Sequence, residues 1–285
     1  MTGSAREPFG VRLAAAMAAR GPLCVGIDPH PQLLAAWGLD DDVAGLERFS
    51  RTVVEALGDR VAVLKPQCAF FERHGSPGVA VLERVLAEAA QAGALTIADA
   101  KRGDIGSTMA AYAEAFAGEG SPLAADAVTA SPYLGFESLR PLLDLAATTG
   151  RGVFVLALTS NPEGPPLQLA TTADGRSVAQ TILDAVAAGN RGARPLGSVG
   201  VVVGATAGSA AAGLQVDVNG PVLAPGIGAQ GAGAAQLRAL FPDALAAVLP
   251  SSSREVLGAG PSTSALRQSA DRTLEQVLTV LGRPC

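Results

Sequence analysis

Residues 95–108 read LTIADAKRGDIGST, and this stretch joins an apolar run directly to a cluster of charges. Its first half is typical of a parallel strand that is buried on both faces. Asp99, Lys101, Arg102 and Asp104 then follow in a chain of which only 16% is charged. The stretch therefore predicts a strand that ends in a polar site and leads into a helix.

The same pattern recurs along the whole chain. Eight short apolar runs each end at a polar or turn residue, at 23–28, 61–66, 95–101, 127–133, 153–160, 199–206, 221–228 and 245–253. Stretches with helical periodicity lie between them, for example at 78–93, 107–120, 176–189 and 234–241. This alternation predicts an α/β protein, a (β/α)₈ TIM barrel that occupies residues 1–285 as a single domain with a short N-terminal helix. A doubly wound open sheet is the alternative that the same alternation allows.

Composition narrows the partners and the compartment. The net charge of -5 leaves no basic surface for nucleic acid or an anionic membrane. Three cysteines without paired spacing favour a reducing compartment over a disulfide framework or a zinc site. The apolar stretch 9–21 contains Arg12 and Arg20, which favours an amphipathic helix over an export signal. We therefore expect a cytoplasmic protein with no metal site and no membrane span.

Candidate site residues lie at the ends of the predicted strands, where barrels of this kind build their active sites. These residues are Asp28, Lys65, Asp99, Lys101 and Ser160, with Arg254 after the eighth strand. Side chains alternate along a strand, so Asp99 and Lys101 are expected to point the same way, with Lys65 on the adjacent strand about 4.8 Å away. The spacing predicts a lysine–aspartate–lysine cluster at the barrel mouth.

Two other features of the sequence bear on this cluster. A purely structural interpretation is a network of salt bridges, or a turn in which Asp104 and Ser107 cap the following helix. The glycine-rich stretch APGIGAQG at 224–231 precedes a helix, and Arg254 follows the next strand. Backbone N–H groups at such a turn, together with an arginine, favour a phosphate site and hence a barrel of the phosphate-binding type.

Four motifs in this order resemble the orotidine 5′-phosphate decarboxylase family, particularly its longer bacterial subfamily. They are VGIDPH at 25–30, LKPQ at 64–67, ADAKRGDIGST at 98–108 and APGIGAQG at 224–231. The resemblance implies decarboxylation of orotidine 5′-monophosphate to UMP in pyrimidine biosynthesis, without a metal or an organic cofactor. The chain departs from the family at Gly231-Ala232, where a double glycine is usual, and at SSSRE, 251–255.

The resemblance also implies a role for each matching residue. Lys101 would stabilise the carbanion at C6 and protonate it, Asp99 would lie beside the departing CO₂, and Lys65 would hold this array and contact the ribose. The family pattern further implies a homodimer with shared active sites. The remaining assignments are Asp104, Ile105 and Thr108 to the partner subunit's site, Asp28 to the ribose, Ser160 to the pyrimidine amide, and Gly228, Gln230 and Arg254 to the phosphate.

Three other functions fit parts of the same pattern. Metal-dependent sugar-phosphate decarboxylases or synthases share the D-x-K-x-x-D motif. Lys65 and the GIGAQG loop favour orotidine 5′-phosphate decarboxylase over this alternative. A non-catalytic nucleotide-binding protein would keep the ligand contacts without the reaction. A Schiff-base lysine would need a neutral amine, and the flanking carboxylates favour the charged form of Lys101.

Overall fold

The computed structural model describes residues 6–205, 213–226, 237–238, 240–241 and 243–282. Its eight strands pair in parallel in chain order and close into a barrel. They are β1 (Cys24–Ile27), β2 (Val63–Pro66), β3 (Leu95–Arg102), β4 (Ala127–Ala130), β5 (Gly152–Leu158), β6 (Val199–Val203), β7 (Val222–Pro225) and β8 (Val248–Ser252). The predicted (β/α)₈ barrel is confirmed, and the open-sheet alternative is wrong because β8 pairs with β1.

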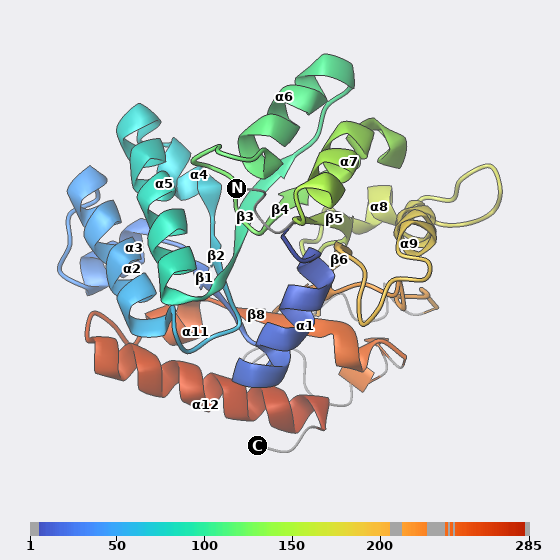
Figure 1. Cartoon of the computed structure of the whole chain (residues 1–285). Helices are drawn as coiled ribbons and strands as arrows, with labels where there is room; N and C mark the ends of the chain where they lie inside the picture. Colours follow the sequence, from blue (N-terminus) through green and yellow to red (C-terminus); the bar gives the residue numbers. More distant parts are fainter. Residues whose placement is uncertain (1–5, 206–212, 227–236, 239, 242, 283–285) are drawn as a thin grey trace.

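Helices surround the strands (Figure 1). They are α1 (Phe9–Arg20), α2 (Pro31–Ala36), α3 (Val43–Leu57), α4 (Cys68–Glu72), α5 (Gly75–Ala92), α6 (Gly106–Ala117), α7 (Arg140–Thr148), α8 (Pro165–Gln168), α9 (Val178–Gly189), α11 (Arg254–Leu257) and α12 (Thr263–Leu281). Two 3₁₀ helices, η1 (Phe136–Leu139) and η3 (Leu245–Ala247), complete the described elements. In the part of the chain that the structure describes, no helix is long and apolar enough to cross a membrane.

The sequence of α3 shows how the outer helices form. Asp42 begins the helix, and its carboxylate accepts a hydrogen bond from the Gly45 N–H at 2.8 Å. Leu46, Phe49 and Val53 recur at helical spacing and are fully buried. The apolar face of α3 therefore turns toward the barrel, where it belongs to the main hydrophobic core.

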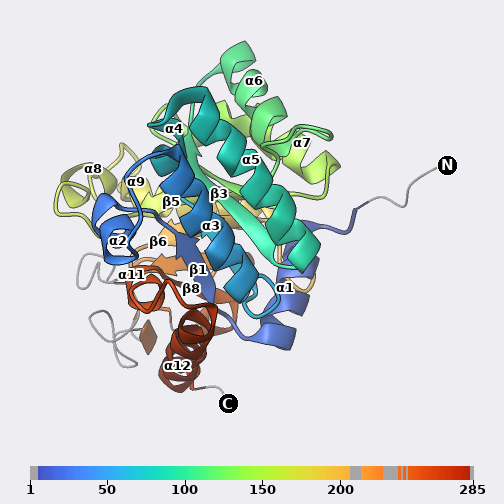
Figure 2. The same ribbon diagram turned by 90° about the vertical axis from the view of Figure 1, so that its left-hand side faces the viewer.

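Helix α1 closes the end of the barrel where the strands begin. Phe9, Leu13 and Met17 are buried in a cluster that includes at least one residue from every strand. Phe9 meets Phe154 of β5 edge to face, with ring centroids 5.9 Å apart. In Figure 2 α1 lies at one end of the barrel and the short helices α2 and α8 lie at the other. The mouth where the strands end is thus the end that α1 leaves open.

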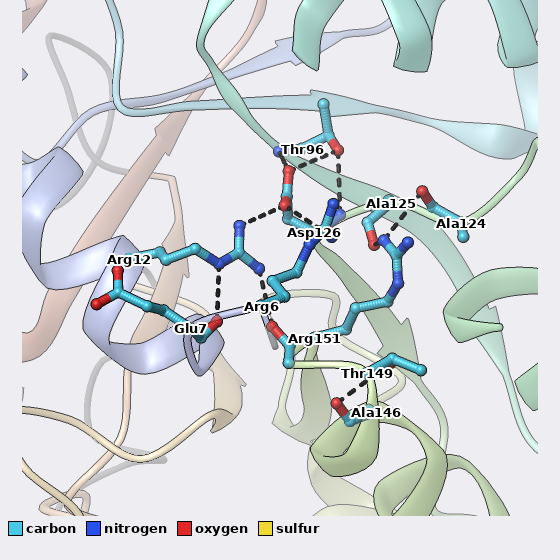
Figure 3. A network of polar contacts seen from close by, with 11 residues as sticks. Arg6, Glu7, Arg12, Thr96, Ala124, Ala125, Asp126, Ala146, Thr149 and Arg151 are labelled. Atoms are coloured by element: carbon cyan, nitrogen blue, oxygen red, sulfur yellow. Dashed lines mark hydrogen bonds and ion pairs between the residues drawn. The ribbon is translucent and has the colours of Figure 1, made fainter. Parts of the chain in front are cut away.

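A polar network fixes α1 to this closed end (Figure 3). The Arg12 guanidinium pairs with the carboxylate of Asp126, which directly precedes β4, and donates to the Gly150 carbonyl at 2.9 Å. The other oxygen of Asp126 accepts the backbone N–H of Thr96 in β3 at 3.0 Å. Arg6 adds a longer contact to Asp126. One buried carboxylate therefore ties the N-terminal helix to the starts of neighbouring strands.

Candidate active site

A lysine–aspartate–lysine array lies at the open end of β2 and β3. Lys65 Nζ donates to Asp99 Oδ2 at 2.7 Å, and Lys101 Nζ donates to Asp99 Oδ1 at 2.5 Å. The structure therefore brings together the three residues that the strand-end spacing placed in one cluster. Each carboxylate oxygen of Asp99 faces a separate ammonium group.

The backbone around Lys101 differs from the regular strand that the alternation of side chains predicts. Ala98 pairs with Val128 and Arg102 pairs with Ala130, so residues 99–101 of β3 lie opposite the single residue Thr129 of β4. Lys101 has a φ of 50°, in the left-handed region that residues other than glycine rarely adopt. A β-bulge, rather than simple alternation of side chains, thus places Lys101 beside Asp99.

The two lysines differ in burial. The side chains of Lys65 and Asp99 are each only 9% exposed, whereas that of Lys101 is 45% exposed. Lys65 therefore faces the protein interior and holds Asp99, while Lys101 is accessible to a ligand at the barrel mouth.

The electrostatics keep this buried pair ionised. Burial alone raises the pKa of Asp99, but the ammonium groups of Lys65 and Lys101 outweigh it and lower the pKa to about 2. Burial lowers the pKa of Lys65, but the carboxylates of Asp99 and Asp28 outweigh this effect and raise it above its usual range. Both groups therefore carry their charges at neutral pH.

Asp28 directly follows β1, the strand beside β2, and contributes a second carboxylate. Its Oδ2 accepts a hydrogen bond from the Ser253 hydroxyl, which follows β8. Its Oδ1 is buried and has no hydrogen-bond partner among the described residues. A buried acceptor without a partner is costly unless a ligand satisfies it, so Asp28 is suited to accept from a ligand hydroxyl.

Two further candidates follow strands at the same end of the barrel. Ser160 lies two residues beyond β5, and Arg254 begins α11 immediately after Ser253. Both residues are exposed, and within the described ranges neither side chain forms a hydrogen bond or ion pair. They lie at the expected end of the barrel but form no described hydrogen bond or ion pair with the lysine–aspartate–lysine array. Gly228 and Gln230 lie outside the described residues.

Asp104, Ile105 and Thr108 lie on the loop that leads into α6 and on its first turn. The Asp104 carboxylate accepts the backbone N–H of Ile105 at 2.8 Å. Ile105 is the N-cap residue of α6, and no side chain caps this helix. The capping interpretation of Asp104 and Ser107 is therefore wrong. Ile105 and Thr108 are exposed, and none of the three residues forms a described hydrogen bond with the array of its own chain.

Sequence reasoning missed two polar residues of this site, Thr129 and Ser253. The Thr129 hydroxyl donates to Asp99 Oδ1 at 2.9 Å, and Ser253 donates to Asp28 as described above. Both residues follow the rule that located the others, because Thr129 lies near the end of β4 and Ser253 follows β8. A search for hydroxyls as well as charges at strand ends would have found them.

Two cysteines, Cys24 and Cys68, lie within the described part of the chain. Cys24 and Cys68 are buried free thiols, and burial raises the pKa of each to about 12, so both stay neutral. Over the described ranges, no group of three or more His, Cys, Asp or Glu side chains is arranged to hold a metal ion.

The closed barrel and its ionic site at the strand ends define a (β/α)₈-barrel enzyme. Comparison with protein families gives the particular family. Residues 21–269 match the model described as the orotidine 5′-phosphate decarboxylase / HUMPS family, and the chain belongs to this family.

Individual relatives agree with this membership. Orotidine 5′-phosphate decarboxylase of Salinispora arenicola is 65% identical over 268 residues, which are 94% of this chain and 96% of the relative. The enzyme of the same name from Streptomyces coelicolor is 62% identical over 275 residues, or 96% and 99% of the two chains. A solved structure from Streptomyces avermitilis, assigned to the same activity, has a TM-score of 0.96 and 62% identity and covers 99% of each chain.

Proposed function

We propose that the array of Lys65, Asp99 and Lys101 carries out the decarboxylation of orotidine 5′-monophosphate. The enzyme is a carboxy-lyase that converts this nucleotide to UMP in pyrimidine biosynthesis, as its family and its curated relatives indicate. One observation carries the assignment of the chemistry to these residues. The accessible Lys101 ammonium lies 2.5 Å from a buried carboxylate that a second, buried lysine holds in place.

The reaction needs a positive charge where a negative charge develops. The bond between C6 and the carboxylate breaks, CO₂ leaves, and the electron pair stays on C6. The Lys101 ammonium stabilises this pair and then transfers a proton to C6, and the neutral amine regains a proton from water. Because the carbanion scarcely exists in the ground state, this attraction stabilises the transition state selectively and raises turnover. Asp99, itself held by Lys65, keeps Lys101 in position.

Residues away from the reacting carbon bind the rest of the nucleotide in this proposal. The unsatisfied Oδ1 of Asp28 would accept a ribose hydroxyl. Ser160 would contact the pyrimidine amide, while Gly228, Gln230 and Arg254 would bind the phosphate. The exposed Arg254 directly after Ser253 supports the phosphate assignment, because its guanidinium makes no ion pair with another described residue.

We further propose that the enzyme is a homodimer with shared active sites. Ile105 is 61% exposed and Tyr133 is 75% exposed, which is unusual for large apolar side chains. Their loops are adjacent, because Ser131 N–H donates to the Arg102 carbonyl at 2.8 Å. A partner seated on these loops would cover both side chains and receive Asp104, Ile105 and Thr108 in its own site.

We also propose that residues 1–285 form one barrel domain and that the enzyme works in the cytoplasm without a metal or an organic cofactor. The apolar stretch that resembles an export signal is α1, whose Leu13 is fully buried at the closed end of the barrel. Its removal would expose the strand starts. The unpaired thiols of Cys24 and Cys68 also support a reducing compartment.

The first test is decarboxylation of orotidine 5′-monophosphate by protein stripped of metal and assayed in EDTA, followed through the loss of pyrimidine absorbance. We expect undiminished turnover, with release of UMP. Activity that is lost in EDTA and restored by Mg²⁺ would contradict the cofactor-free mechanism and favour a metal-dependent sugar-phosphate enzyme of the same barrel class. A Schiff base trapped by borohydride would contradict the proposed role of Lys101.

A further inference from the structure

The hydroxyl of Thr129 joins the two catalytic groups of β3 through one atom. Thr129 Oγ1 accepts the backbone N–H of Lys101 at 2.9 Å and donates to Asp99 Oδ1 at 2.9 Å. Asp99 Oδ1 is also the oxygen that receives Lys101 Nζ. Thr129 is only 1% exposed, so water does not replace these contacts.

This bridge lies at the irregular point of the β3–β4 ladder. On the β4 side, residues 99–101 of the bulge lie opposite the single residue Thr129. The Lys101 N–H therefore bonds to the Thr129 side chain, where a regular parallel ladder would supply a backbone carbonyl of the neighbouring strand. The contact also fixes the residue that adopts the left-handed backbone conformation, Lys101.

We propose that Thr129 is a positioning residue, whose hydroxyl sets the direction in which the Lys101 ammonium points by anchoring both its backbone and its carboxylate partner. This inference rests on the proposed role of Lys101 in decarboxylation. The γ atom of residue 129 must both accept and donate a hydrogen bond. A hydroxyl group can do both, whereas a methyl group can do neither. The side chain need not touch the substrate, because it acts through Lys101 and Asp99.

The test compares a variant that lacks the hydroxyl of Thr129 with a variant that lacks its methyl group. Thr129→Val keeps the shape of the side chain and removes the hydroxyl, whereas Thr129→Ser keeps the hydroxyl and removes a methyl group. Misplacement of a catalytic group by about 1 Å costs on the order of 100-fold in rate. We expect kcat of Thr129→Val to fall roughly 10- to 100-fold while KM and the affinity for UMP change little, and Thr129→Ser to recover most of kcat.

A matched control exists at the opposite end of the barrel. Thr96 is also a buried strand threonine, and its hydroxyl bonds to the carboxylate of Asp126. Thr96→Val is expected to lower the melting temperature without lowering kcat of the folded enzyme. If Thr129→Val lowers the melting temperature through altered packing, a comparison of Thr129→Ser with Thr129→Ala tests the hydroxyl again, because these two variants differ only in that group.

Each outcome decides between the inference and its alternatives. Unchanged kcat in folded Thr129→Val would overturn the positioning role, as would equal loss of kcat in the serine and valine variants. A rise in KM with unchanged kcat would assign Thr129 to substrate binding instead and would also overturn it. If the wild-type enzyme does not decarboxylate orotidine 5′-monophosphate, the proposed function itself is rejected. The wild-type assay shows this before any variant is compared.

Discussion

Asp99 lies between a buried ammonium group and an accessible one, and in the proposed function the buried lysine positions Asp99 while the accessible lysine reacts. Lys65 lies in the interior, where its charge is satisfied by Asp99 and Asp28. The Lys101 ammonium lies at a similar distance from Asp99, but the Lys101 side chain is exposed at the mouth of the barrel. The same carboxylate therefore orients two lysines for different tasks.

Replacement of Lys101 and replacement of Arg254 should affect different kinetic constants. Lys101→Ala removes the charge that stabilises the carbanion and the proton that quenches it, so turnover is expected to be nearly abolished while the fold persists. Arg254→Ala is expected to weaken transition-state binding by about 2 to 5 kcal/mol, chiefly as a higher KM for the phosphorylated substrate. Steady-state kinetics of both variants, with circular dichroism as the control for folding, measure the difference. Equal loss of kcat in both would contradict this division of roles.

The charge of Asp99 should make stability depend on pH in the acid range. The pKa of Asp99 in the folded state is about 2, below its usual value, so its contribution is fully present above about pH 4 and disappears as the pH falls toward 2. Urea unfolding of the wild type and of Asp99→Asn should show a difference of about 2 kcal/mol or more that is constant from about pH 7 to 5 and shrinks below about pH 4. A difference that grows on acidification would contradict the ionised state of Asp99.

At the scale of elements, the order and the ends of the eight strands could be predicted because a buried parallel strand leaves a plain signature, a short apolar run closed by a polar residue. The bulge in β3 could not be predicted in this way. Residues 95–101 look regular in sequence, and the bulge depends on how many residues of β4 lie opposite, which is a property of the pairing. The spacing of Asp99 and Lys101 therefore led to the correct cluster through an incorrect local geometry.

The network that ties α1 to the barrel gives an element-scale prediction. Asp126→Asn keeps the shape of a buried side chain but leaves Arg12 without its anionic partner. We expect a loss of about 1 to 3 kcal/mol in the free energy of unfolding, with little change in kcat because the network lies at the closed end of the barrel. Urea denaturation and steady-state kinetics on the same sample test both parts.

The exposed ion pair of Arg140 and Glu137 supplies the control. Arg140→Gln also removes one charge from an ion pair, but on the solvent side of α7. Its expected effect on the free energy of unfolding is within about 1 kcal/mol. Similar losses in the two variants would mean that burial does not strengthen the contact with Asp126.

At the scale of the whole molecule, the proposed site residues fall into two groups. Some come together within one chain, and others are proposed to act in the site of a partner subunit. Lys65, Asp99 and Lys101 meet within the chain, so strand-end spacing could locate them. Asp104 bonds only to its own neighbour Ile105 among the described residues, and its function in the proposal comes from a second subunit. Spacing within one sequence carries no information about a partner subunit, and the assignment of Asp104 rests on the family resemblance.

Mixing of two inactive variants tests the shared site. Lys101→Ala and Asp104→Ala subunits each lack one group, and a mixed dimer with one subunit of each kind contains one site with both groups intact. We expect activity to appear after the two inactive proteins are unfolded and refolded together. Each variant refolded alone is the control. Confirmed mixed dimers without activity would show that Asp104 acts within its own chain or outside the site.

Helix α1 precedes all eight strands in the chain, yet the surface that receives it is complete only after the eighth strand has formed. Arg12 and Asp126 are separated by 114 positions, and the apolar cluster around Phe9, Leu13 and Met17 also needs β8, which ends at Ser252. Contacts so distant in sequence form late. The nascent chain therefore carries an apolar helix without a complete docking site until β8 has been synthesised, so chaperones can bind it during that time, and a chain that terminates before β8 exposes this helix to proteases.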